Sequence, residues 1–157
     1  VCFCHDWSEV EKIKSTFMQR GITDVVTQAH VKGDVVKFYG VEGTGFFRYY
    51  YSGDDTETKF GDEERNGNPQ YYSFSSSNLQ ADAEKLSCLL KTPVYGGDAI
   101  IQEDGCYLII DFNDFPSFSR CREEAAKAIV RRMKQKVEAS HKTSSNEKYK
   151  DDMNSYS

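Results

Sequence analysis

The chain has 157 residues, of which 38% are hydrophobic and 13% aromatic, which is enough apolar material for one folded domain with a buried core. Its formal net charge of −5 argues against broad, sequence-independent binding to nucleic acids, which requires a basic surface. No apolar run reaches the length of a membrane-spanning helix and no signal peptide is visible, so neither a nucleic acid nor a membrane is expected as a partner.

The five cysteines lie at irregular spacings that do not suggest a disulfide framework. They favour a reduced, cytoplasmic location. Cys2, Cys4 and His5, in "CFCH", are of types that bind zinc, but no second pair of ligands follows at the spacing of a zinc site. A short strand with small, buried thiols is therefore the preferred interpretation of this stretch.

The amino-terminal part is expected to contain a helix between two strands. After a short strand at residues 2–5, Ser8 and Glu11 fit a capping box, and apolar residues then recur at helical spacing. Gly21 is typical of the residue that ends a helix. Residues 23–31, "TDVVTQAHV", are predicted to form the second strand.

The middle of the chain predicts a hairpin followed by a helix. Residues 35–41 and 46–52 form the two strands, joined by the turn "GTG". Residues 53–70 are polar, charged and rich in glycine, which is typical either of a disordered loop or of a mobile lid. Residues 78–91 follow as an amphipathic helix, which Pro93 ends. The apolar face of this helix is expected to consist of Leu79, Ala83, Leu86 and Leu90.

The remaining elements complete an α+β domain. Two strands are predicted at residues 95–102 and 106–113, followed by a helix that Ser119 can cap. The apolar side of that helix is expected to consist of Ala125, Ala126, Ile129 and Met133. Residues 139–157 lack apolar periodicity and predict a disordered tail. The order of elements indicates a largely antiparallel sheet flanked by helices.

The stretch "LIIDFNDFPSF", residues 108–118, has the apolar pattern of a buried strand but contains Asp111 and Asn113. Asp104-Gly105 predicts a two-residue hairpin turn before it, and counting outward from that turn places Asp98 directly opposite Asp111. Because strand side chains alternate between faces, Asn113 lies on the same face as Asp111. A one-residue bulge in either strand would break the facing pair.

Two carboxylates that face each other across a ladder repel each other, and a hard divalent cation removes this repulsion. Asp98, Asp111 and Asn113 offer only oxygen ligands, which suit Mg²⁺ or Mn²⁺ rather than zinc. Mg²⁺ commonly shares its coordination sphere with substrate phosphates, so chemistry on phosphate groups is the natural companion. The other interpretation is a strand end that opens onto solvent, where both carboxylates are hydrated.

Two cations lie on the predicted hairpin that precedes these carboxylates. Lys37 lies between apolar neighbours and Arg48 lies on the adjoining strand, so a turn centred near Gly43 would place the two roughly opposite each other. Such a cationic patch would bind a phosphate or an anionic substrate. An isolated lysine in a strand is otherwise typical of an edge residue that faces water.

Taken together, these pieces resemble the carboxy-terminal part of the ATP-grasp superfamily over roughly residues 1–138. The resemblance lies in the order of "DVVTQAHVKGD", "VVKFYGV", "GGDAII" and "IIDFNDFPSF", and "D-x-N-x-F-P" after an apolar strand is its most specific fragment. It implies an ATP-grasp carboxy-terminal lobe, with residues 1–27 as a remnant of the small lobe and residues 28–138 as the large lobe. The Val1 start fits a chain that begins inside the small lobe.

The resemblance also implies roles for individual residues. Gln28 would bind the adenine of ATP at the hinge, Lys37 would meet phosphate groups of nucleotide or substrate, and Asp98, Asp111 and Asn113 would bind catalytic Mg²⁺ or Mn²⁺. The closest branches in appearance are glutathione-synthetase-like ligases, which form an acyl phosphate, and inositol polyphosphate kinases. A non-catalytic descendant of the fold that serves as a binding module is a further possibility, because the phosphate-binding loop of the small lobe has no counterpart here.

Overall fold

The computed structural model describes the backbone of residues 2–52 and 69–154, with side chains as far as residue 141. It contains two compact units, residues 1–31 and residues 32–157, and each is treated by itself. The boundary lies between Val31 and Lys32, slightly later than the predicted division after residue 27. Most of the predicted loop at residues 53–70 lies outside the described residues.

The first unit is built around helix α1 (Trp7–Gln19). Its N-cap is Asp6, whose Oδ1 accepts a hydrogen bond from the backbone N–H of Glu9 at 3.0 Å, so the predicted capping box is wrong by about half a turn. The predicted helix end is confirmed, because Gly21 adopts a left-handed φ of 79° and the next N–H bonds back to Phe17 at 2.9 Å.

Neither strand predicted for this unit is present. Residues 2–5 and 23–31 have no ladder partner among the described residues and run as irregular chain. An alternating apolar pattern stabilises a strand only where a neighbouring strand pairs with it and one face is buried. Here the alternating residues are largely exposed; the side chain of Val26, for example, is 95% exposed.

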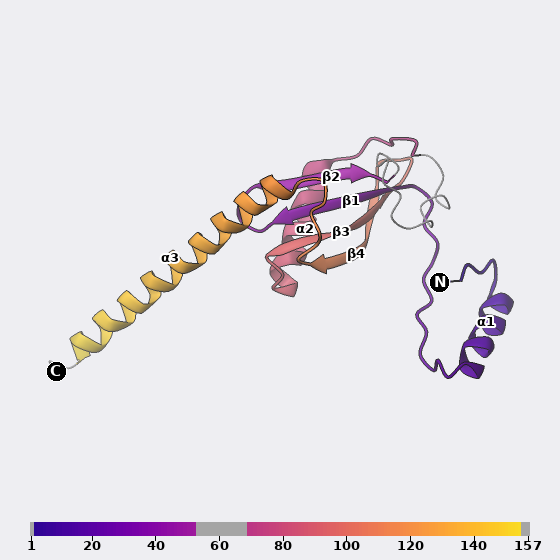
Figure 1. The fold of residues 1–157 in the computed structure, drawn as a ribbon, viewed down its shortest axis with the longest axis horizontal. Coiled ribbons are helices and arrows are strands. Elements are labelled where there is room, and N and C mark those ends of the chain that lie inside the picture. The colour runs from indigo at the N-terminus through magenta and orange to yellow at the C-terminus, as the bar shows by residue number, and fades with distance from the viewer. Residues whose placement is uncertain (1, 53–68, 155–157) are drawn as a thin grey trace. The chain divides into compact units, whose positions relative to one another are not determined.

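The second unit contains one antiparallel sheet with the strand order β2-β1-β3-β4 (Figure 1). The strands are β1 (Asp34–Val41), β2 (Phe46–Tyr51), β3 (Val94–Ile101) and β4 (Tyr107–Asp114). Two helices complete the unit, α2 (Ser76–Leu90) and α3 (Arg122–Asn154). The predicted α+β class with a largely antiparallel sheet is therefore confirmed.

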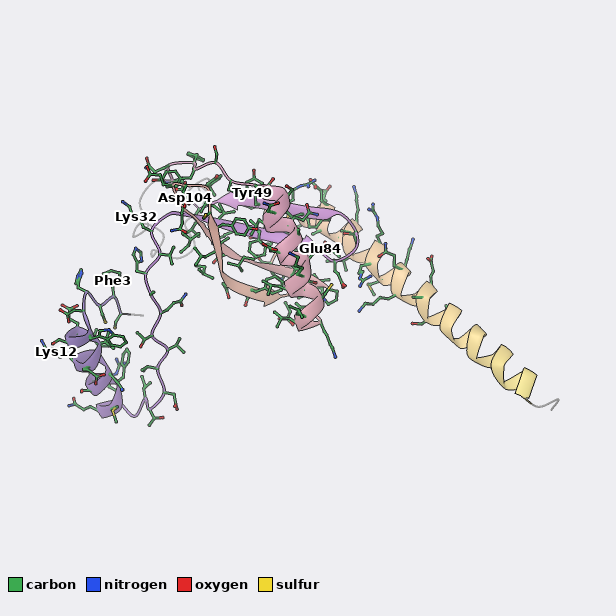
Figure 2. The ribbon with its side chains drawn as sticks, turned by 180° about the vertical axis from the view of Figure 1, so that it is seen from behind. Phe3, Lys12, Lys32, Tyr49, Glu84 and Asp104 are labelled. Atoms are coloured by element: carbon green, nitrogen blue, oxygen red, sulfur yellow. The ribbon has the colours of Figure 1, made fainter. Side chains whose placement is uncertain are left out.

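Helix α2 covers one face of the sheet and forms the larger core with it. Figure 2 shows the side of the molecule from which α2, marked by Glu84, is seen against the strands. The core residues are Val36, Phe38, Phe47, Leu79, Ala83, Tyr95, Ala99 and Ile101. Ser75 is the N-cap of the helix. The buried stripe continues at Ser87 and not, as was predicted, at Leu90; the side chain of Leu90 is 56% exposed. Residues 79, 83 and 87 are each four apart, which keeps them on one helical face.

The opposite face of the sheet carries a second core under the first turns of α3. Its buried residues are Tyr39, Val41, Phe46, Val94, Phe118, Cys121, Ala125 and Ala128. Ala126 and Met133, which were predicted to be on the apolar side of this helix, are exposed. The buried stripe runs through residues 121, 125 and 128, because only these turns of α3 reach the sheet.

The backbone of residues 139–154 continues as α3, which differs from the disordered tail predicted for residues 139–157. This stretch contains neither glycine nor proline, so no residue interrupts the helix that begins at Arg122. Figure 1 shows these turns extending past the strands.

The β3–β4 hairpin has a longer turn than predicted and a compensating bulge. The N–H of Gly105, whose φ is 82°, donates to the carbonyl of Gln102 at 3.0 Å, and the N–H of Gln102 donates to the carbonyl of Cys106 at 2.8 Å. The turn therefore contains three residues and shifts the register by one. An irregularity between Asp98 and Ala99, where Ile110 is the extra residue on β4, shifts the register back.

Candidate functional site

The face of the sheet that carries the second core also carries a line of polar side chains across all four strands. Tyr50 on β2 is directly opposite Lys37 on β1, Lys37 is directly opposite Asp98 on β3, and Asp98 is directly opposite Asp111 on β4. Directly opposite residues project from the same face. We call these four residues the cross-strand row. The predicted pairing of Asp98 with Asp111 is confirmed.

Asn113 extends the carboxylate end of the cross-strand row. It follows Asp111 by two residues on the same strand, and its Nδ2 donates a hydrogen bond to Oδ2 of Asp111 at 2.5 Å. Asp111 and Asn113 are both exposed, because β4 is the edge strand, whereas Asp98 on β3 is half-buried. The strand predicted to be buried is therefore an exposed edge. Its carboxylate and amide are open to a ligand from solution.

Lys37 is the cation that the strand register places directly opposite a carboxylate, that of Asp98. It is half-buried, and its register position between Tyr50 and Asp98 puts a cation directly opposite one of the two carboxylates of the cross-strand row. Opposite charges at directly opposite positions stabilise a sheet. The predicted lysine is thus at the site, in direct register with one of the candidate metal ligands.

Arg48 lies farther from the carboxylates than predicted. The β1–β2 strands pair about a point between Gly43 and Thr44, so Arg48 is opposite Tyr39 and only diagonal to Lys37. Its guanidinium forms an ion pair with Glu124 of α3 and donates to the carbonyl of Phe47 at 2.8 Å. Arg48 therefore connects the sheet to α3, and the predicted cationic patch of Lys37 and Arg48 does not form in that way.

A small cavity of about 250 Å³ lies beside Arg48 at the end of the hairpin. Its charged lining consists of Arg48, Glu124, Lys127 and Arg131, and the last of these donates to the carbonyl of Thr44 at 3.1 Å. The cavity is thus basic on balance. Both arginines that line it already have protein partners, and these contacts connect the hairpin to α3.

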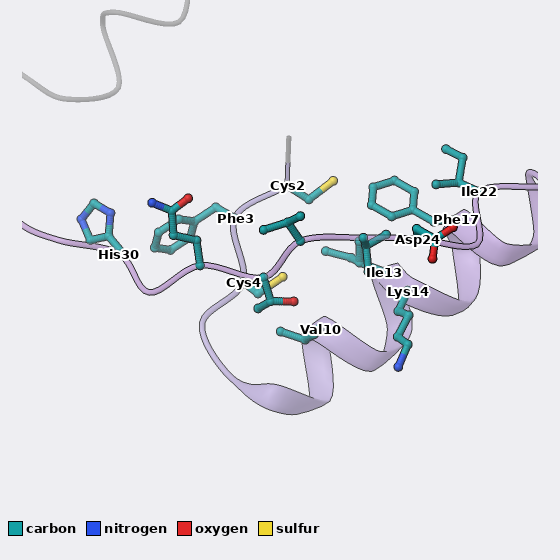
Figure 3. A pocket seen from close by; sticks show the side chains of 14 residues that line it. Cys2, Phe3, Cys4, Val10, Ile13, Lys14, Phe17, Ile22, Asp24 and His30 are labelled. Atoms are coloured by element: carbon teal, nitrogen blue, oxygen red, sulfur yellow. The ribbon is translucent and has the colours of Figure 1, made fainter. Parts of the chain in front are cut away.

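Gln28 belongs to the first unit, whereas the residues of the cross-strand row belong to the second. It lines a cavity of about 540 Å³ in that unit, whose apolar wall is made by residues of α1 such as Val10, Ile13 and Phe17 (Figure 3). None of the residues of α1 is fully buried. Within its own unit, Gln28 therefore lies on an apolar cavity.

The segment after β4 closes over the sheet next to the cross-strand row. Pro116 covers Gly96, where an added Cβ would lie 2.8 Å from the proline ring. Phe115 and Phe118 have left-handed φ values of 44° and 49°, which are unfavourable for a residue with a side chain by about 1 kcal/mol each. Phe118 is nevertheless buried, and Phe115 bonds through its N–H to the carbonyl of Val94 at 2.9 Å.

Arg120 is the residue that sequence reasoning missed. It lies in this closing segment, and its guanidinium carbon is 4.5 Å from the centroid of the ring of Tyr50, at the tyrosine end of the cross-strand row. Arg120 lies between β4 and α3, so neither the alternation of a strand nor the periodicity of a helix could indicate its position. The only clue was its position shortly after "D-x-N-x-F-P", where a loop must return to the sheet.

The phenol groups of two tyrosines report the charges around the site. The pKa of Tyr39 is raised, first by burial; the positive charges of Lys37 and Arg120 lower it, and the charge of Asp98 raises it. The pKa of Tyr50 is likewise raised, first by burial, and again Arg120 opposes the shift. The charges of Lys37, Asp98 and Arg120 therefore all contribute to the pKa shift of the Tyr39 phenol.

The donor set fits a hard cation that prefers oxygen ligands better than a softer metal such as zinc. Among the residues whose side chains are described, no group of three or more His, Cys, Asp or Glu could hold a metal ion. Asp98, Asp111 and Asn113 would supply two carboxylates and one amide, and Mg²⁺ commonly takes only a few protein ligands and completes its sphere with water and phosphate oxygens. These three residues are thus a suitable partial set for Mg²⁺ or Mn²⁺.

No family model, no curated protein and no solved structure matches this chain. Among the described residues, no helix is both long enough and apolar enough to cross a membrane. The five cysteines all lie within the described residues and are free thiols. The function must therefore be argued from the site itself.

Proposed function

We propose that the chain is the carboxy-terminal part of an ATP-grasp enzyme that uses Mg²⁺–ATP for phosphoryl transfer to an anionic small molecule. The reaction we favour is ATP-dependent ligation through an acyl phosphate, and we propose a cytoplasmic location for it. The observation that supports this function is the cross-strand row, in which Asp98 and Asp111 face each other with Asn113 beside them and Lys37 opposite Asp98.

The chain's own residues would have distinct roles in this reaction. Asp98, Asp111 and Asn113 would hold Mg²⁺ or Mn²⁺, which supplies charge neutralisation for phosphate oxygens when it is bound. Lys37 would hold a phosphate oxygen next to these ligands, and Gln28 would bind the adenine. Transfer of a phosphoryl group depends mainly on positioning and electrostatic stabilisation, so the site needs no nucleophilic side chain.

A second candidate function is a non-catalytic binding module derived from the same fold. Lys37 lies opposite Asp98 and compensates one carboxylate without any ligand, which gives the cross-strand row a structural role of its own. The two candidates differ in what they require of the carboxylates. A catalytic site needs both of them to bind a metal with nucleotide, whereas a structural ion pair needs only Lys37 and Asp98.

Calorimetric titration of Mg²⁺–ATP into the chain tests the proposal. The variants are Asp98→Ala and Asp111→Ala, and the matched control is Asp114→Ala, which removes an exposed carboxylate from the opposite face of the same strand. We expect metal-dependent heat in the wild-type chain and in the control, and its loss in both site variants. Heat that persists in both site variants would refute the site. No heat in any protein would favour the binding module.

A further inference from the structure

The cross-strand row has an ordered distribution of charge. Read from β2 to β4, it runs from an aromatic ring at Tyr50 to a cation at Lys37 and then to two carboxylates at Asp98 and Asp111. Adjacent strands lie about 4.8 Å apart, so the whole row spans about 14 Å. A metal ion at one end and an oxyanion at the other would match this distribution. The end at Tyr50 needs a second cation if it is to hold a group with more than one negative charge.

Arg120 supplies that second cation. It is half-buried, its guanidinium carbon lies 4.5 Å from the centroid of the Tyr50 ring, and its charge acts on the buried phenol of Tyr39 together with that of Lys37. A guanidinium that stacks on an aromatic face keeps its N–H groups in the plane of its edge, where they can donate in pairs to a phosphate or carboxylate. Arg48, the cation expected in this role, is opposite Tyr39 rather than Lys37.

The closing segment holds Arg120 in place from both sides. Before it, Phe118 packs against Tyr39 with ring centroids 5.6 Å apart. After it, Cys121 is buried, and its N–H donates to the carbonyl of Phe118 at 3.0 Å. The unfavourable left-handed φ of Phe118 persists because this packing determines it. A cation fixed between two buried residues loses little freedom when it binds an anion.

We propose that Arg120 and Lys37 form an oxyanion subsite at the tyrosine end of the cross-strand row, which binds a phosphoryl or carboxylate group of a substrate. The subsite deepens the proposed function, on which it rests, because it names the anionic group that lies next to the carboxylate end. That group belongs either to the nucleotide or to the acceptor. Arg120 is thus a binding residue that the sequence pattern did not indicate.

Binding of inorganic pyrophosphate to the chain, measured by calorimetry without metal, tests the subsite. We expect Arg120→Ala and Arg120→Gln to weaken this binding by about tenfold, the size expected for the loss of one charge-assisted hydrogen bond. Arg120→Lys should restore part of the affinity. The matched control is Arg122→Ala, an exposed arginine in the first turn of α3, which should leave the affinity within about twofold of the wild type. Equal affinity in the wild type, Arg120→Ala and Arg120→Gln would overturn the subsite.

Electron paramagnetic resonance of Mn²⁺ separates this inference from the proposed function. Mn²⁺ alone should bind equally well to the wild type and to Arg120→Ala, and more weakly to Asp111→Ala. If Mn²⁺ does not bind while pyrophosphate affinity still depends on Arg120, the metal site fails and the subsite stands. If Mn²⁺ binds and pyrophosphate affinity does not depend on Arg120, the metal site stands and the subsite is overturned.

Two further titrations identify the source of the anion. Weaker binding of Mn²⁺–ATP by Arg120→Ala would assign the subsite to the nucleotide. Weaker binding of inorganic phosphate by the same variant, in the presence of saturating Mn²⁺–ADP, would assign it to the acceptor. Unchanged binding in both titrations would overturn the subsite.

Discussion

Replacing Asp111 by Asn should have little effect on stability without a metal and a clear effect with one. The carboxylates of Asp98 and Asp111 project from directly opposite positions, where side chains lie about 6 Å apart, and in water two such charges repel by about 0.7 kcal/mol. Asp111 is also attracted by Lys37, two strands away at about 10 Å, by about 0.4 kcal/mol. Removing the Asp111 charge should therefore stabilise the metal-free protein by only about 0.3 kcal/mol.

The divalent cation changes this comparison. A ligand that binds only the folded state stabilises it by RT ln(1 + [L]/Kd), which is about 1.4 kcal/mol for 10 mM Mn²⁺ at a Kd of about 1 mM. The wild type should gain this amount, and Asp111→Asn should gain little, because one carboxylate ligand is lost. The sign of the difference between the two proteins should thus reverse when Mn²⁺ is added.

Urea unfolding at low salt, once with a chelator and once with Mn²⁺, measures this double difference. Asp114→Asn is the control, since it removes a carboxylate from the other face of β4. The measured quantity is the stabilisation by Mn²⁺ in the wild type minus the stabilisation by Mn²⁺ in Asp111→Asn. Effects of the substitution that are the same with and without metal cancel in this difference. Equal stabilisation of wild type and Asp111→Asn by Mn²⁺, or none in either, would show that the cross-strand row holds no cation.

Three further changes test the packing that supports the site. Tyr95→Phe should stabilise the protein by about 1 kcal/mol in urea unfolding, because the buried hydroxyl of Tyr95 has no hydrogen-bond partner among the described residues; a loss of stability would mean that the hydroxyl is satisfied. Gly40→Ala should destabilise by about 3 kcal/mol in thermal unfolding, because its Cβ would lie 2.3 Å from the Tyr95 ring, and an unchanged melting temperature would contradict this contact. Asp34→Ala should cost about 2–3 kcal/mol, because its buried carboxylate accepts from the N–H groups of Gln70 and Tyr72 at 2.8 and 3.0 Å; hydrogen exchange at those two amides should rise, and unchanged protection would argue against it.

The register of the carboxylates was predicted correctly, although the hairpin differs from the prediction in two ways. The sequence signal Asp104-Gly105 identifies a turn, but it does not distinguish a two-residue turn from the three-residue turn that Gly105 ends. That extra residue would have moved Asp111 away from Asp98. The bulge at Ile110 restores the pairing, and nothing in the apolar run "LIIDF" predicts it.

The errors in the first unit have a different physical cause. The stretch at residues 23–31 has the composition of a strand, yet strand formation depends on a partner that local sequence does not specify. The N-cap was misplaced because Asp6 and Ser8 are both good capping residues, and only the structure shows that the N–H of Glu9 bonds to Asp6. Gly21 was predictable because a left-handed position after a helix depends on a single residue type.

The candidate site was predictable only where it lies on strands. Lys37, Asp98 and Asp111 follow from strand alternation and from the pairing of neighbours. Arg48 was misassigned because the hairpin is centred between Gly43 and Thr44, one residue later than a pair of Lys37 with Arg48 requires, which moves the partner of Arg48 by two positions to Tyr39. Arg120 was missed because its place depends on how the closing segment folds back, and this is determined by Pro116 over Gly96 and by the burial of Phe118.

The arrangement of the cross-strand row would allow the proposed metal site to fold before a divalent cation binds. Two carboxylates placed in a buried strand pair would require a bound cation for stability. Here Asp111 is exposed at the sheet edge, and Lys37 compensates the half-buried Asp98 from the other side. We therefore expect the sheet to fold without a metal, while the proposed site would present two carboxylates to one. This is the property that a site needs if its metal enters and leaves with a substrate, whereas a structural metal site depends on its ion to fold.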